Sequence, residues 1–491
     1  MIFFRKIVFY LFCILYLVTC PILLLYAFGF IVKPGAEYGI VKTGLIYLST
    51  VPSNAQVFVG TSRYARKTPV MIRDLMPGSY TLKVVQPGYR PWVQTVPVEA
   101  EKASALDYVL LLPSSWKVHR ISAESFSELE VIPDSGFGLL KRGDHAADFW
   151  AVDFEEDEVT PLFREDSPWA QAKIRQVFTG KESSLVIFVL ETTKGLQYWA
   201  VDLAKPEKSP RDLTLLFPEP PVQIRWEKNH PEYAFVLQGA DINRLNLQDG
   251  ELKPSLLREV RGLGVEDGNL YALRRDGLVV RFDKNGKDDR FLLEDPALAH
   301  SLFGDAGNYR IEAWSSDLMI LMGEKGDLIS NRLPYKLVEA GVLGVDYFRK
   351  GRRLLVWKKD RVGIVDFSRE KSPGSEMFEK GPRLRWIFQK GNSVSQAFWV
   401  YEGSHILFRD GNHVYLLDTE TYGEPEVLEI VKVREGTAVY YHEENGHLYY
   451  LNEESGRLES IEILPKKAVI NFPFPERREG TVVREKNQNA I

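Results

Sequence analysis

A repeated strand ending constrains this chain more than any other feature of its sequence. Between residues 126 and 464, strand-like runs end in a residue, usually apolar, that is followed by Asp or Asn and a short turn. The instances are Val152-Asp153, Val201-Asp202, Leu245-Asn246, Phe282-Asp283, Ser330-Asn331, Val365-Asp366, Leu417-Asp418 and Leu451-Asn452. Their mean spacing is about 43 residues, and such a period with strands only is typical of a β-propeller.

A second marker sets the register of these repeats. A glycine-containing turn precedes most of the strands, at Gly143, Gly195, Gly239, Gly277, Gly326, Gly411 and Gly446, whereas the sixth repeat has Lys358-Lys359-Asp360-Arg361. Each unit is therefore predicted as strand, glycine turn, strand, Asp or Asn turn, strand. We expect eight blades, although the irregular spacing also allows seven. Trp116–Ile121 is the candidate for closing the last blade, because ring closure removes exposed sheet edges.

The N-terminal segment predicts a membrane anchor. Ile7–Val32 has 26 residues and no charge. As a helix it would be roughly 39 Å long, enough to cross a ~30 Å hydrocarbon core with tilt. Arg5 and Lys6 precede it, so we expect the N-terminus inside and the bulk of the chain outside the cytoplasm. A cleaved signal peptide or a lipidated Cys20 is the alternative, but the run is long and lacks a good cleavage site.

Charge and cysteine content restrict the functions of the remaining chain. The first 33 residues carry +3 of the net charge of −5, which leaves −8 on the rest. An acidic soluble part argues against nucleic-acid binding, which relies on basic surfaces. The two cysteines, Cys13 and Cys20, both lie in the hydrophobic run, so the soluble part has no disulfide or thiolate metal site.

Residues 43–113 predict a small β-sandwich. Strand-like runs are divided by the turns Pro52-Ser53-Asn54-Ala55 and Met76-Pro77-Gly78-Ser79. The ordered turn and strand positions are Pro52, Asn54, Ala55, Gly60, Pro69, Pro77, Gly78, Gly88 and Tyr89. This series resembles the PEGA domain of bacterial surface proteins. Asn54 stands where that family usually has Gly, but Asn also tolerates the left-handed conformation, and Thr61–Arg66 lengthens one hairpin.

The PEGA resemblance implies an extracytoplasmic sandwich beside a membrane segment, acting as a spacer or as a contact to cell-envelope polymers. The repeat region resembles WD40-like and quinoprotein-like bacterial propellers in architecture only, because it has no strict Gly-His or Trp-Asp signature. We therefore predict an all-β protein of the bacterial cytoplasmic membrane. Its expected parts are a cytoplasmic end and transmembrane helix (1–33), a linker (34–42), a PEGA-like sandwich (43–113), a propeller (114–470) and a disordered polar tail (471–491).

Motifs for catalysis are missing from the sequence. It contains no HExxH, GxSxG or Walker sequence, and its eight histidines are scattered. Asp283–Asp289 loosely resembles a calcium loop, but it falls on a predicted turn where Asn-Gly is expected anyway. We therefore predict a non-enzymatic protein without metal, catalytic residues or cofactor.

The glycine turns should gather on one face of the propeller, where loops on a rigid scaffold usually carry binding. The basic residues expected there are Arg142, His145, Lys194, Arg274, Arg275, Lys358, Lys359, Arg361 and Arg409. Acids are interspersed among them, so a strong anion site is not assured. The basic run Arg349–Arg353 should face the opposite end, because one strand separates it from Lys358–Arg361.

The sequence predicts a binding or scaffold protein whose propeller docks a protein or an envelope glycan, without a nucleic-acid partner. Two alternatives remain open at this point. One is a propeller-type hydrolase or lyase that acts on envelope polymers, and the other is a purely structural surface protein.

Overall fold

The computed structural model describes most of the chain. The described ranges are 2–27, 30–32, 40–164, 166–227, 230–266, 269–282, 288–293, 309–315, 318–330, 337–367, 384–419 and 425–463. Three predicted features lie wholly or largely outside them: the polar tail (471–491), most of the linker (34–42) and residues 283–287 of the calcium-like loop.

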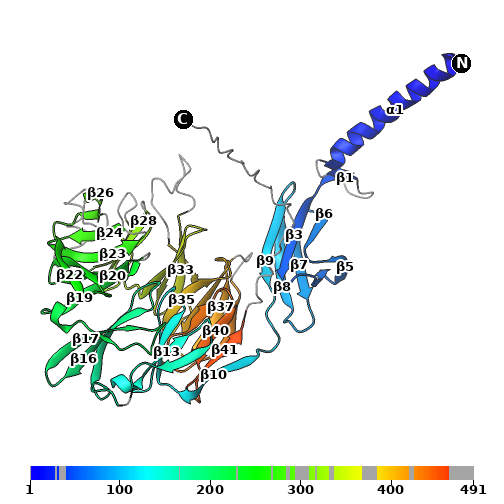
Figure 1. Cartoon of the computed structure of the whole chain (residues 1–491). Coiled ribbons are helices and arrows are strands. Elements are labelled where there is room, and N and C mark those ends of the chain that lie inside the picture. Colours follow the sequence, from blue (N-terminus) through cyan, green and yellow to red (C-terminus); the bar gives the residue numbers. More distant parts are fainter. Residues whose placement is uncertain are drawn as a thin grey trace, which may run out of the picture.

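The chain begins with one long helix, α1 (Ile2–Ala27), which extends away from the β-sheets in Figure 1. Its segment Phe4–Pro21 is long and apolar enough to cross a membrane, with a mean hydropathy of 1.6, and it is unburied within the protein. The predicted helix reached Val32, and this was wrong. Phe30–Val32 forms strand β1, which pairs antiparallel with β2 (Ile40–Lys42). The β-branched Ile31 and Val32 favour this extended backbone.

Two sheets form the N-terminal sandwich (Figure 1). One sheet has the order β6 (Val70–Leu75), β3 (Gly44–Val51) and β9 (Ala103–Leu110). The other has the order β5 (Ser62–Lys67), β4 (Gln56–Val59), β7 (Gly78–Val85) and β8 (Trp92–Val98). Alternate residues of the strands point inward, and Ile46, Val57 and Leu82 are fully buried in the shared core.

The remaining strands form repeated four-stranded antiparallel units. Unit 1 contains β11 (Glu128–Val131), β12 (Phe137–Lys141), β13 (Phe149–Asp153) and β14 (Glu158–Pro161). Unit 2 contains β15 (Lys173–Phe178), β16 (Leu185–Thr192), β17 (Gly195–Asp202) and β18 (Arg211–Asp212). Unit 3 contains β19 (Pro221–Glu227), β20 (His230–Gln238), β21 (Asp241–Asn246) and β22 (Glu251–Leu257). Unit 4 contains β23 (Val260–Glu266), β24 (Asn269–Arg274), β25 (Val279–Phe282) and β26 (Asp288–Leu293).

The second half of the repeat region continues in the same order. Unit 5 contains β27 (Tyr309–Ser315), β28 (Leu318–Gly323), β29 (Leu328–Ser330) and β30 (Leu337–Glu339). Unit 6 contains β31 (Gly344–Phe348), β32 (Arg353–Lys358), β33 (Arg361–Asp366) and β34 (Leu384–Phe388). Unit 7 contains β35 (Val394–Val400), β36 (His405–Asp410), β37 (His413–Asp418) and β38 (Val427–Lys432). Unit 8 contains β39 (Tyr440–His442), β40 (His447–Leu451), β41 (Arg457–Glu462) and β10 (Val118–Ser125).

Unit 8 closes the propeller with strands from both ends of the repeat region. The early strand β10 pairs antiparallel with β41, near the end of the described chain. The predicted closing strand, Trp116–Ile121, is therefore confirmed in role, and the observed strand begins and ends a little later. Beside it, the Tyr449 hydroxyl donates to the Phe154 carbonyl oxygen at 2.9 Å, which ties unit 8 to unit 1.

Units 4 and 5 depart from the regular pattern. Their first strands, β23 and β27, pair parallel to each other, so that the two units form one eight-stranded sheet. Gly262 and Gly264 of β23 face the backbone of Tyr309 and Ile311, where a side chain would collide. Because two of the eight described units share one sheet, the number of blades stays a prediction.

The two β-modules also touch each other. Leu110, at the end of β9, is only 5% exposed and belongs to one apolar cluster with Val400 and Tyr401 of the propeller. Trp116, in the connection between the modules, packs against the same cluster. The sandwich therefore contacts units 7 and 8 through side chains as well as through the chain itself.

Candidate functional site

In each unit a turn joins the second strand to the third, and we call this turn the second bend. The second bend lies beside the start of the next unit. We call this end of the propeller the rim. At six junctions a backbone N–H of the following unit or its connection donates to a bend carbonyl. These bonds join Ile174 to Asp144, Val260 to Ala240, Val342 to Gly326, Val394 to Lys359, Val433 to Asn412 and Phe126 to Gly456, at 2.7–2.9 Å.

The predicted register is wrong in the last unit. The turn at Gly446 joins β39 to β40, the first and second strands, and therefore lies at the end opposite the rim. The second bend of this unit contains Asn452 and Gly456 instead. The reason is that Asn452, the Asp or Asn marker of this unit, follows the second strand β40, whereas the marker of every other unit comes at the end of the third strand.

The basic run in unit 6 divides as the sequence predicts. Strand β32 separates the turn at Arg349–Arg352 from the turn at Lys359–Asp360. Only the second turn is part of the rim. The run is therefore not a continuous anion-binding patch.

Five predicted rim residues are paired with acids. Arg142 lies 3.3 Å from Glu124 and also covers the Trp150 ring, at 4.9 Å from its centroid. Arg274 lies 3.0 Å from Asp276, and Lys358 lies 3.2 Å from Glu339. His145 and Arg361 are similarly placed beside Asp148 and Asp360. Each of these five side chains therefore has a carboxylate beside it, and none is an isolated positive charge on the rim.

Arg409 differs most from its expected position. It is only 5% exposed, and its guanidinium donates to the backbone carbonyls of Gly411 and Thr437. Burial lowers the pKa of this guanidinium. Arg409 therefore holds two rim segments together and does not face a ligand.

Three predicted rim cations are exposed, and the described part of the chain shows no ion pair for them. Lys194, Arg275 and Lys359 belong to units 2, 4 and 6, respectively. They are separated by whole units and do not converge on one point. The predicted residues thus form a rim, but they do not assemble a common anion site.

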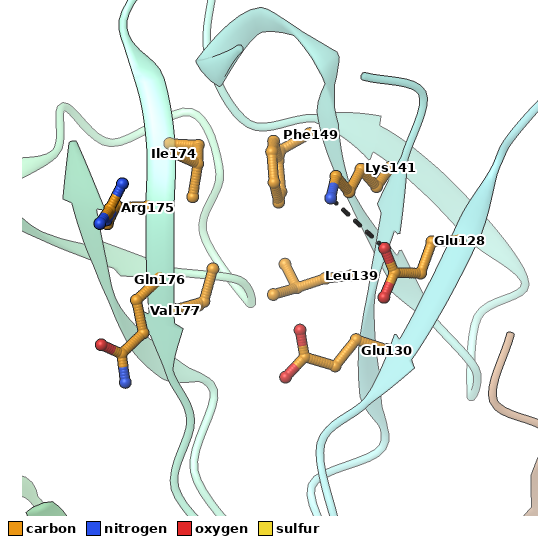
Figure 2. Close-up of a pocket in the computed structure, with 9 residues that line it drawn as sticks. All are labelled: Glu128, Glu130, Leu139, Lys141, Phe149, Ile174, Arg175, Gln176 and Val177. Carbon is orange, nitrogen blue, oxygen red and sulfur yellow. Dashed lines mark hydrogen bonds and ion pairs between the residues drawn. The ribbon is translucent and has the colours of Figure 1, made fainter. Parts of the chain in front are cut away.

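A better candidate is a cleft of about 160 Å³ between units 1 and 2 (Figure 2). It begins beside the rim bend that holds Arg142 and His145. Its walls come from β11, β12 and β13 on one side and from β15 on the other. The lining residues are Glu128, Glu130, Leu139, Lys141, Phe149, Ile174, Arg175, Gln176 and Val177.

On the unit 1 side of the cleft, one ammonium group is paired with two carboxylates. The Lys141 ammonium lies 3.4 Å from Glu128 and 3.1 Å from Asp144. Hydrogen bonds and attraction from these two carboxylates raise the pKa of Lys141 against the opposing effect of burial. On the opposite wall, the Arg175 guanidinium lies 3.7 Å from Glu191.

Glu130 lies two residues beyond Glu128 on β11 with an exposed side chain, and no hydrogen-bond or ion-pair partner for it is found among the described residues. Its carboxylate points into the space in front of Val177 in Figure 2. Water reaches the side chain, yet it is surrounded by enough protein that burial raises its pKa. Repulsion from Glu128 adds to this shift, and attraction from Lys141 reduces it.

Apolar side chains form the rest of the walls. Ile174 and Val177 point toward the cavity from β15, and Leu139 and Phe149 face them from unit 1 (Figure 2). Such a combination suits an extended apolar group that ends in a polar or charged atom.

The sequence analysis missed this cleft. Its signal is the alternation Glu128-Leu129-Glu130, which places both carboxylates on one side of β11 and the buried Leu129 on the other. The alternation is visible in the sequence, but the residues on β15 that complete the cleft are more than 40 positions away. Within the described ranges, no group of three His, Cys, Asp or Glu side chains could hold a metal ion.

The N-terminal sandwich has the conformations that its motif requires. Asn54 adopts a left-handed backbone with φ of 71°, as the sequence predicts. Its N–H donates to the Thr68 carbonyl at 2.8 Å, beside Pro69. Comparison with known families matches the PEGA domain at residues 43–112. This part of the chain is a PEGA domain. It covers 70 of the 491 residues, so the name describes the module rather than the whole protein.

Several solved propellers are similar to the chain beyond the PEGA domain. BamB from Moraxella catarrhalis is 11% identical, with 71% of this chain and 100% of that chain covered at a TM-score of 0.41. Saccharomyces cerevisiae Sqt1 is 12% identical, with 72% and 98% covered at a TM-score of 0.43. No curated protein matches the sequence. We assign the propeller from the strand order described above.

Proposed function

We propose that this chain is a membrane-anchored binding protein, in which the propeller docks a protein partner outside the cytoplasm and the PEGA domain holds it off the membrane. The observation that carries the proposal is the cleft between units 1 and 2, where apolar and charged side chains of the described chain lie together. The helix α1 supports the anchor, and the PEGA domain supports the extracytoplasmic location.

The architecture favours contact over chemistry at this cleft. Lys141, Glu128 and Arg175 are each engaged with neighbouring charges. The cleft lining contains no Ser, Thr, Cys or His side chain that could act as a nucleophile. A bound partner segment would contact a preformed surface, which limits the entropy lost on binding.

Site-specific photocrosslinking of the full chain in its native membrane tests the proposal. A crosslinking side chain at Gln176, in the cleft wall, should capture a partner, whereas one at Glu156 should not. Glu156 lies in the turn after β13, at the end of unit 1 opposite the rim. The captured protein should then bind the purified chain, and Ile174→Trp, which fills the cleft, should weaken binding by about tenfold or more.

Two results would contradict the proposal. Equal capture from Gln176 and Glu156 would show that contact at the cleft is nonspecific. Unchanged affinity of the Ile174→Trp variant, with the variant folded as judged by its melting temperature, would show that the partner binds elsewhere.

A further inference from the structure

The cleft has an uncompensated negative charge. Three carboxylates, Glu128, Glu130 and Asp144, surround the single ammonium group of Lys141. Lys141 pairs with Glu128 and Asp144 at 3.4 and 3.1 Å. Arg175 projects from β15 away from Phe149 in Figure 2, and it pairs with Glu191 at 3.7 Å, so it does not offset these carboxylates. A ligand that brings one positive charge to Glu130 would reduce this imbalance.

The shape of the cleft adds a second requirement. The cleft is small, with a volume of about 160 Å³. Ile174 and Val177 lie on one side of it and face Leu139 on the other (Figure 2). These apolar walls lead to the carboxylate of Glu130. A matching ligand is therefore a slender aliphatic chain that ends in a cation, because the chain buries apolar surface while its end meets the carboxylate.

We infer that the cleft binds a lysine or arginine side chain of the partner protein, with the aliphatic stem between Leu139 and Val177 and the charged end on Glu130. This inference rests on the proposed docking function and specifies its ligand. The protein already contains one example of such an arrangement: Lys141 passes its ammonium over the Phe149 ring, at 5.9 Å from the centroid, to reach two carboxylates.

The raised pKa of Glu130 is consistent with this role. The Glu130 side chain is exposed, but the protein beside it disfavours the charged form, so a cation placed there gains more than it would beside a fully solvated carboxylate. Binding specificity would thus come from the position of one carboxylate at the end of an apolar slot.

The test uses the full chain in detergent and acetylated, amidated tripeptides as probes. Gly-Lys-Gly and Gly-Arg-Gly carry the proposed side chains, Gly-norleucine-Gly keeps an aliphatic stem without charge, and Gly-Glu-Gly reverses the charge. We expect the basic peptides to bind about tenfold more tightly than the other two, as measured by ligand-observed NMR, since a charged hydrogen bond contributes about 1.5–3 kcal/mol. Cadaverine serves as a free amine.

Glu130→Gln keeps the shape of the side chain and removes its charge. It should lower the affinity for the basic peptides by about tenfold, whereas Glu156→Gln, an exposed carboxylate in the same unit, should leave it unchanged. Melting temperatures of both variants confirm that they are folded.

The inference is overturned if the norleucine peptide binds as well as the basic ones, if no peptide binds at about 10 mM, or if Glu130→Gln changes nothing. Tighter binding of cadaverine than of either basic peptide would assign the cleft to a free amine and would also overturn it. If Ile174→Trp blocks binding of the captured partner while Glu130→Gln leaves that binding unchanged, the docking function stands. Only the inference that a lysine or arginine side chain occupies the cleft is then rejected.

Discussion

At the scale of single residues, the interior of unit 7 contains a histidine that the fold keeps neutral. His405 on β36 is 5% exposed, and its Nδ1 lies 2.9 Å from the Ser404 hydroxyl. Burial lowers the pKa of His405 to about 4 from its ordinary value of 6.5. Asp418 Oδ2 lies 4.0 Å from Nε2 of the ring and opposes this effect of burial.

The stability of the protein should therefore depend on pH through His405. Above pH 6.5 the ring is neutral in both the folded and the unfolded chain. Between pH 6.5 and 4 the unfolded chain takes up a proton that the folded chain does not, so stability falls as the pH falls, by about 3 kcal/mol in total. The melting temperature of the wild type should drop across this range more than that of His405→Gln.

A matched control is His145→Gln, because His145 is about half exposed in the rim bend of unit 1. Carboxyl groups with raised pKa values, such as Asp346, increase the stability of the fold as the pH falls. This effect is the same in the wild type and in both histidine variants. Parallel pH profiles for the wild type and His405→Gln would contradict the prediction.

At the scale of elements, the parallel pair β23–β27 is the most specialised feature of the propeller. Gly264 has no side chain, and a Cβ there would lie 2.6 Å from the Ile311 carbonyl oxygen. Gln223 of β19 braces the same place: its amide nitrogen lies 3.4 Å from the Tyr309 carbonyl, and its oxygen accepts from the Leu263 N–H at 3.3 Å. Three neighbouring inner strands are thus bonded together.

We expect Gly264→Ala to force β23 and β27 apart and to destabilise the protein by about 1–3 kcal/mol, because the clash is with backbone that cannot rotate away. Chemical denaturation of the purified chain measures this loss. Gly239→Asn is the control: Gly239 is in a rim bend with φ of 57°, a conformation that Asn tolerates. Equal stability of Gly264→Ala and wild type would mean that the parallel pairing is absent in solution.

At the scale of the whole molecule, the positions of the cysteines make the topology measurable. Cys13 and Cys20 both lie in α1, so the remaining chain offers no thiol. In a Cys13→Ser, Cys20→Ser background, Lys205→Cys lies in the exposed turn after β17, and Ile2→Cys lies at the first residue of α1, before the apolar segment Phe4–Pro21. A membrane-impermeant maleimide should label the first in intact cells and the second only after permeabilisation.

The reverse labelling pattern would place the propeller in the cytoplasm and would reject the proposed location. Labelling of both positions in intact cells would point to damaged membranes and is checked with a cytoplasmic protein. Release of the Lys205→Cys protein into the soluble fraction would contradict the anchor itself.

Local sequence determines much of this protein. The 43-residue period, the turn residues and the alternation of apolar positions predict an all-β propeller, because they act within one strand or hairpin. The PEGA domain is predictable for the same reason: Asn54 and Gly78 adopt the positive φ angles that their turns require. The long uncharged run identifies α1, although its end at Ala27 depends on the strand pairing that follows.

Only the tertiary structure decided which distant segments of the chain pair as strands or form a cleft together. The closure of unit 8 depends on β10 joining β41 across more than 300 residues, and the fusion of units 4 and 5 depends on two glycines meeting another strand. The cleft likewise joins Glu130 to Val177, which no local pattern connects. Hydrophobic periodicity specifies which face of a strand is buried, but the partner of that face is chosen only when the whole ring packs.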